Sequence, residues 1–173
     1  MTKSLNWTRK AFNRSIEFKG EKGEIIGTMT FKILDRDVEA ELNGKKFRFD
    51  VYGFVNKEVA ITDENNLEVG KIYLGFRNKA EAQLTNGEKY IWKRADFFMR
   101  EWELIHDLPD TDNDPVIINY DRDRNFLNQE GKISILESSE NSDLLTLVGF
   151  FIGFYFLRRR SAAAAVALGV AIS

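Results

Sequence analysis

Apolar residues are irregularly spaced over 5–18, but from residue 28 onward several short segments alternate between apolar and polar positions, and a period of two is typical of β-strands with one buried face. In 28–33, three large apolar residues are separated by threonine and lysine. Two further alternating runs, 38–42 and 46–51, flank Asn43-Gly44. An Asn-Gly pair between two such runs is a strong signal for a β-hairpin, so the pattern predicts antiparallel strands joined by tight turns.

The same pattern repeats downstream, around the turn-rich stretches 63–66 and 86–87. Further strands are expected in Phe54–Thr62, Leu67–Phe76, Ala80–Leu84, Tyr90–Trp92, Phe97–Ile105, Val116–Tyr120 and Lys132–Leu136. Short strands with alternating faces and tight turns usually close into a sandwich or a barrel. The chain is therefore expected to be mainly β, with about ten to twelve short strands.

One segment breaks this pattern. Leu144–Leu157 is apolar throughout and is followed by Arg158, Arg159 and Arg160. A helix of this length reaches about 21 Å, against roughly 30 Å for the hydrocarbon core of a bilayer. We therefore expect a buried core helix, capped at its start by Ser142 or Asp143, with the apolar faces of the strands enclosing it.

The alternative is a membrane anchor formed by 144–172. It would place the three arginines near the middle of the bilayer, at a cost of roughly 8–10 kcal/mol. Gly149 and Gly153 fit both interpretations, because a G-x-x-x-G face lets either a second membrane helix or a strand or large side chain approach closely.

Composition narrows the function classes. The 173 residues suffice for one domain, expected to span 1–160, with an alanine-rich apolar tail at 161–173. The net charge of −2 gives no basic field for nucleic acid. Cysteine is absent and His106 is the only histidine, which excludes Cys/His zinc sites, cysteine nucleophiles and any Ser-His-Asp triad without His106. The polar start of the chain is unlike a secretory signal, so an intracellular, cytoplasmic protein is expected.

Features spread along the chain resemble the tubby C-terminal-like superfamily, which includes tubby proteins, phospholipid scramblases and the plant LURP-one-related proteins. The matching features are Ala40-Glu41-x-x-Gly44, Phe47-x-Phe49, Tyr52-Gly53-Phe54, Asp63 with Gly70-Lys71-Ile72, Gly87-Glu88-x-Tyr90 and Leu144–Leu157. The resemblance implies a closed antiparallel β-barrel of about twelve strands around a hydrophobic C-terminal helix. Tubby proteins bind phosphoinositides and scramblases bind calcium and act on lipids, but neither site matches particular residues here.

Candidate chemistry is sparse. Asp110, Asp112 and Asp114, with Asp121 further on, have the spacing of calcium-loop ligands, but Pro115 stands near the position of the sharp turn. A solvated acidic turn is the simpler interpretation. Neither His106 nor the acidic residues near it come with a nucleophile, so no catalytic residue, metal site or cofactor is expected.

The basic residues lead to the prediction of function. Arg158, Arg159 and Arg160 are the best candidates for binding an anion or a lipid head group, because they adjoin apolar surface in either fold. The sequence predicts a non-enzymatic intracellular binding module whose partner is anionic phospholipid, a membrane surface or a protein. The alternative is a membrane-anchored protein with a cytoplasmic β-domain and 144–172 in the bilayer.

Overall fold

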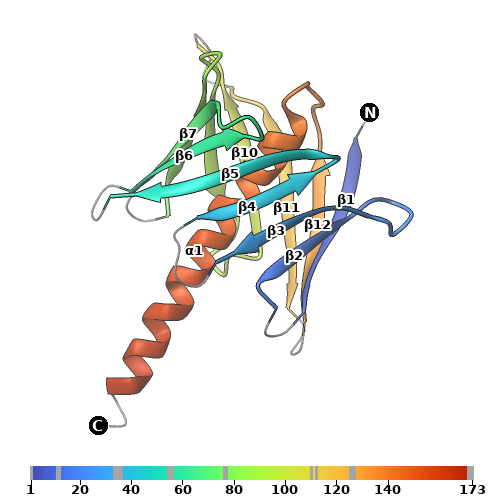
Figure 1. The fold of residues 1–173 in the computed structure, drawn as a ribbon. Coiled ribbons are helices and arrows are strands. Elements are labelled where there is room, and N and C mark those ends of the chain that lie inside the picture. Colours follow the sequence, from blue (N-terminus) through green and yellow to red (C-terminus); the bar gives the residue numbers. More distant parts are fainter. Residues whose placement is uncertain are drawn as a thin grey trace.

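In the computed structural model, the alternating segments form the strands of a closed β-barrel. The structure describes residues 2–10, 13–32, 37–53, 57–75, 78–109, 111, 113–124 and 128–170. Twelve antiparallel strands close around one helix (Figure 1). The strands are β1 Lys3–Lys10, β2 Ser15–Lys19, β3 Ile25–Phe31, β4 Val38–Leu42, β5 Lys45–Tyr52, β6 Lys57–Asp63, β7 Glu68–Leu74, β8 Ala80–Leu84, β9 Lys89–Arg94, β10 Glu101–Asp107, β11 Val116–Arg124 and β12 Asn128–Ile135. The predicted fold class is confirmed.

Each strand pairs with its neighbours in sequence, and β1 pairs with β12 to close the barrel. This closing pair runs along the whole of both strands, from Lys3 opposite Ile135 to Lys10 opposite Asn128. The predicted hairpin joins β4 to β5, and both Asn43 and Gly44 have positive φ, as a two-residue β-hairpin turn of this kind requires.

The helix α1, Ser142–Val170, is longer than expected. It continues through the three arginines into the alanine-rich segment, since neither arginine nor alanine interrupts a helix. The predicted capping role of Ser142 or Asp143 is wrong. The Ser142 hydroxyl accepts a hydrogen bond from the backbone N–H of Ser139, and the Asp143 carboxylate pairs with Asn43 and Lys45 of the β4–β5 hairpin instead.

The part of α1 inside the barrel is apolar all round, which suits a helix enclosed on every side. Its buried apolar side chains are Leu144, Leu145, Leu147, Val148, Phe150, Phe151, Ile152, Phe154 and Phe156, and Thr146 is buried among them. They meet a ring of aromatic side chains from the strands. Phe150 packs edge-on against Trp7 at 5.0 Å, and Phe151 stacks on Phe49 at 4.8 Å.

The G-x-x-x-G face of α1 receives two of these rings. A Cβ atom built on Gly149 would lie 2.3 Å from the Tyr120 hydroxyl, and one on Gly153 would lie 2.5 Å from Cε2 of Trp102. Tyr120 and Trp102 stack on each other at 5.7 Å. The close approach expected for a helix enclosed by strands is therefore made by two large side chains.

The described residues contain no helix that is both long enough and apolar enough to cross a membrane.

Candidate functional site

The two ends of the barrel differ because the connections between antiparallel strands alternate between them. At one end, the β4–β5 hairpin contacts Asp143 at the start of α1, and we call this the entry end. At the other, the Arg160 guanidinium donates a hydrogen bond to the backbone carbonyl of Phe97 in the β9–β10 connection, and we call this the exit end. Beyond the exit end, the last turns of α1 project out of the barrel (Figure 1).

Cationic side chains gather around the helix at the exit end. We call them the exit cluster, and its members are Arg9, Lys57, Arg94, Arg100, Arg158, Arg159 and Arg160. They come from β1, β6, β9, the β9–β10 connection and α1, so barrel closure brings together residues far apart in the sequence.

Aromatic rings hold several of these cations in place. The Arg158 guanidinium lies 5.1 Å from the centroid of the Phe31 ring, and Arg9 lies 5.3 Å from that of Phe154. Arg160 and Arg94 both lie against the Phe97 ring, at 5.7 and 5.5 Å. Such contacts fix a guanidinium group without neutralising its charge.

Among the described carboxylates, Asp96 interacts electrostatically with one member of the exit cluster, Arg100. No salt bridge within the described part of the chain includes a member of the cluster. Burial lowers the pKa of Arg9, and the nearby positive charge of Arg158 lowers it further. A bound anion would relieve this repulsion, so the electrostatics favour a negatively charged ligand.

The β9–β10 connection, residues 95–100, supports part of the cluster. The Asp96 carboxylate accepts backbone hydrogen bonds from Phe98, Arg100 and Glu101. Burial acts to raise the pKa of Asp96, but these three N–H groups and the charge of Arg100 outweigh it and lower the pKa. Met99 is buried with a positive φ, whereas Phe97 and Phe98 are 67% and 62% exposed.

The predicted trio lies within this cluster but points in several directions. Consecutive helical residues are about 100° apart around the axis. Arg158 therefore contacts Phe31 on β3, whereas Arg160 contacts Phe97 in the β9–β10 connection. All three arginines are exposed. Arg94 was a weaker candidate in the sequence, as part of the basic cluster of Lys89, Lys93 and Arg94. Sequence reasoning missed Arg9, Lys57 and Arg100, and only the barrel topology shows that all of these cations share one end.

Sequence reasoning was wrong about the start of one strand near the cluster. The expected strand Phe97–Ile105 begins instead at Glu101, since the Asp96 hydrogen bonds and the positive φ of Met99 form a turn. Phe98 is therefore exposed, whereas Trp102 and Leu104 are buried as expected.

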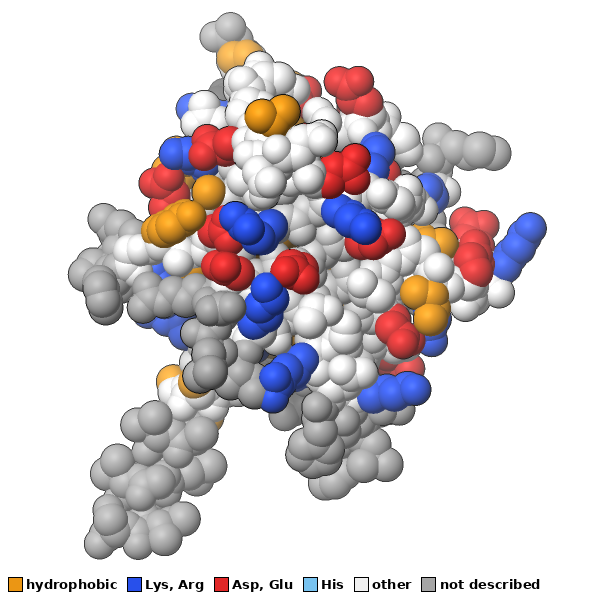
Figure 2. All heavy atoms as spheres, viewed as in Figure 1, with side chains coloured by type: hydrophobic (Ala, Val, Ile, Leu, Met, Phe, Trp, Pro, Cys, Tyr) orange, Lys and Arg blue, Asp and Glu red, His pale blue; other side chains and the backbone are white. Residues whose placement is uncertain are grey.

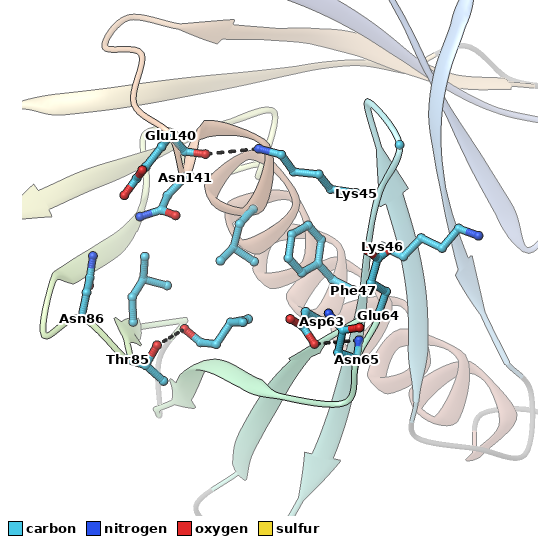
Figure 3. Close-up of a pocket in the computed structure, with 14 residues that line it drawn as sticks. Lys45, Lys46, Phe47, Asp63, Glu64, Asn65, Thr85, Asn86, Glu140 and Asn141 are labelled. Carbon is cyan, nitrogen blue, oxygen red and sulfur yellow. Dashed lines mark hydrogen bonds between the residues drawn. The ribbon is translucent and has the colours of Figure 1, made fainter.

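A pocket of about 430 Å³ lies at the entry end (Figure 3). Its apolar lining is Phe47, Val69, Leu84 and Leu144, and its polar lining includes Lys45, Asp63, Asn65, Asn86, Glu140 and Asn141. Several of these polar groups are engaged within the protein. Lys45 bonds to Asp143 and to the Glu140 carbonyl, and Asp63 accepts the backbone N–H groups of Asn65 and Leu67. This pocket therefore offers an anion less free positive charge than the exit cluster does.

The barrel wall differs from both ends. On the face shown in Figure 2, basic and acidic side chains lie side by side. The ion pairs Lys32–Glu39 and Lys71–Glu58 join neighbouring parts of the wall, and Arg48–Asp50 lies within β5. Paired charges of this kind keep a sheet surface hydrated and favour no ligand of one sign.

His106 and Asp114, two further candidate residues from the sequence, make contacts within the protein. His106 stacks on Tyr90 at 4.8 Å. Asp110 and Asp112 of the proposed calcium loop lie outside the described residues, and Asp114 accepts the backbone N–H of Leu108. No group of three metal-ligating side chains occurs in the described ranges.

No family model, curated protein or solved structure matches this chain. The comparisons identify no family, and the resemblance to the tubby C-terminal-like superfamily stays a prediction.

Proposed function

We propose that this protein is a non-enzymatic binding module of tubby-like fold that recognises anionic lipid head groups at the exit end of its barrel. The observation that carries the proposal is the exit cluster, in which seven cations lie around the emerging helix and none forms a salt bridge with a described carboxylate. Guanidinium groups bind phosphate oxygens through several parallel N–H donors, so six arginines suit lipid phosphates.

The distribution of charge between the two ends also supports the proposal. Among the described residues, the strand connections of the exit end contain four basic and two acidic residues. Those of the entry end, including the segment before α1, contain one basic and seven acidic described residues. A net charge of −2 therefore conceals a strongly polarised molecule. Near an anionic surface, this polarity would turn the exit end toward the lipid.

The proposed location is the cytoplasmic face of a membrane, whose anionic leaflet attracts clusters of lysine and arginine. The second candidate function, an anchor formed by 144–172, requires Leu144–Leu157 to leave the barrel. Because those residues fill the barrel core, we favour recognition at the surface of the barrel.

The experiment is co-sedimentation with vesicles of phosphatidylcholine alone or mixed with phosphatidylglycerol. We expect the native chain to bind only the anionic vesicles, and less strongly as salt is added. Each basic residue near such a surface contributes about 1 kcal/mol, so the triple variant Arg158→Gln, Arg159→Gln, Arg160→Gln should bind roughly 100-fold more weakly.

The matched control removes three positive charges elsewhere, as Lys22→Gln, Lys46→Gln and Lys89→Gln. These lysines lie at or near the entry end, so this variant should bind as the native chain does. Equal losses in the two triple variants, or equal binding to both kinds of vesicle, would refute recognition at the exit end.

A further inference from the structure

We infer that the exit end docks on an anionic phospholipid bilayer with Phe97 and Phe98 in the head-group region and with residues 161–170 of α1 entered into one leaflet, without crossing the membrane. This inference rests on the proposed function, because the exit cluster supplies the attraction to the bilayer. It adds a second contact, made by apolar surface, and it sets the depth of that contact.

The length of the projecting helix matches half a bilayer. From Ser161 to Val170, α1 extends about 15 Å beyond the arginines, which equals about half of the roughly 30 Å hydrocarbon core. The three arginines immediately before this segment would lie among the lipid phosphates, where their charges are favourable. The same arginines that disfavour a helix spanning the membrane thus suit one that stops within the first leaflet.

The projecting segment 161–170 is almost entirely apolar, so its exposure to water is unfavourable. In 161–170 the only polar side chain is that of Ser161, and its hydroxyl donates to the Leu157 carbonyl within the same helix. Ser161 and Ala162–Ala164 are exposed, so the barrel does not cover this part of α1. A helix with no polar face is stable where its surroundings are apolar on every side.

Phe97 and Phe98 lie beside the point where this segment emerges. The hydrogen bond from Arg160 to the Phe97 carbonyl, 3.2 Å long, joins the β9–β10 connection to α1 at the last arginine. Arg94 lies against the Phe97 ring and Arg100 against the Phe98 ring. Exposed aromatic rings flanked by arginines place apolar surface and positive charge at one level, which complements the interface of an anionic bilayer, where negative phosphates adjoin apolar chains.

Charge complementarity decides between a bilayer and a second copy of the chain. The exit end of another copy carries the same positive charge, so two exit ends repel each other. An anionic bilayer neutralises the arginines and buries the apolar segment at the same time. We therefore assign the bilayer as the occupant of this surface.

The depth to which α1 enters the bilayer can be measured, because the chain has no cysteine and a single introduced thiol can be labelled specifically. Ala164→Cys and Gly169→Cys place an environment-sensitive fluorophore on the projecting helix, and Thr85→Cys places it at the entry-end pocket. With anionic vesicles, we expect the labels at 164 and 169 to shift to the blue and to be quenched by nitroxides on the lipid acyl chains. The label at 85 should not respond.

A second measurement tests the aromatic pair. The double variant Phe97→Ser, Phe98→Ser should bind anionic vesicles at least tenfold more weakly. Tyr73→Ser with Ile91→Ser, two exposed apolar residues of the barrel wall, is the matched control and should bind normally.

The outcomes separate this inference from the proposed function. Arginine-dependent binding without quenching at 164 would overturn the inference and leave the proposed function standing. Reaction of the thiol at 169 with an impermeant reagent trapped inside the vesicles would show a crossing helix, which also overturns it. Sedimentation of the protein as a dimer in which the label at 164 is already shielded in the absence of lipid would also overturn the inference. Failure to bind anionic vesicles at all would refute both.

Discussion

Gly153→Ala is a sharp test of how the helix packs in the barrel. An added Cβ atom would lie 2.5 Å from Cε2 of Trp102, 2.7 Å from Nε1 and 2.8 Å from Cζ2. Carbon atoms in contact are normally about 3.5–4.0 Å apart, so the ring or the helix must shift by roughly 1 Å. The ring has no free space, because Trp102 is fully buried, stacks on Tyr120 and donates to the Gly149 carbonyl.

Two effects of opposite sign set the magnitude. Overpacking a filled core costs about 1–3 kcal/mol, whereas replacing glycine by alanine within a helix gains about 1 kcal/mol. Because three ring atoms would lie within 2.8 Å of the added Cβ atom, we expect the overpacking cost in the upper part of that range, about 2–3 kcal/mol, and a net loss of about 1–2 kcal/mol in the free energy of unfolding. For a chain of this size, that corresponds to a fall in Tm of about 2–8 °C.

Urea unfolding followed by circular dichroism measures the change. Gly169→Ala is the matched control, since Gly169 lies in the same helix beyond the barrel and should lose no stability. In the Gly153→Ala background, Trp102→Leu should lower the free energy of unfolding by less than it does in the native chain, because it removes the clash between the added Cβ atom and the indole ring. If Gly153→Ala is as stable as the native chain, or more stable, the close packing of Trp102 on α1 is wrong.

Two further predictions concern buried hydroxyl groups. The Tyr120 hydroxyl donates to the carbonyls of Leu145 and Thr146, both at 3.1 Å, so Tyr120→Phe should lower the free energy of unfolding by about 1 kcal/mol. Burial raises the pKa of Tyr120 well above its ordinary value of 10.0; the folded protein therefore keeps this proton where the unfolded chain loses it, and stability should fall as pH rises above about 10. Urea titrations from pH 8 to 11 should show a shallower fall in Tyr120→Phe than in the exposed control Tyr52→Phe, and identical pH profiles would contradict this. The Thr146 hydroxyl is buried without a hydrogen-bond partner among the described residues, so Thr146→Val should raise the free energy of unfolding by about 1 kcal/mol in the same assay, and a loss of stability would indicate that the hydroxyl is satisfied.

Local pattern was enough to predict much of the fold. Alternation located β4 and β5, and Asn43-Gly44 predicted the turn between them, because only the immediate sequence determines such a hairpin. The length of the apolar run Leu144–Leu157 predicted a helix inside the strands, since a short helix that is apolar all round has to be enclosed.

The errors and omissions arose where distant residues decide the structure. The turn at Asp96 replaced an expected strand, because one carboxylate collects three backbone N–H groups that periodicity cannot reveal. The arginines of 158–160 were conspicuous as a triplet. Nothing in the sequence grouped Arg9 and Arg94 with that triplet, since each joins it only through the closure of the barrel.

The position of α1 after all twelve strands has a consequence for synthesis on the ribosome. The strand β1 is made before the other strands, yet its closing partner β12 and the helix that fills the core are made after them. At roughly 5–20 residues per second, the inner faces of the early strands wait about 7–30 s for that helix. During this interval, Trp7, Phe18 and Phe49 have no core to enter. A chain whose synthesis stops before Leu144 would lack the helix that fills the barrel core.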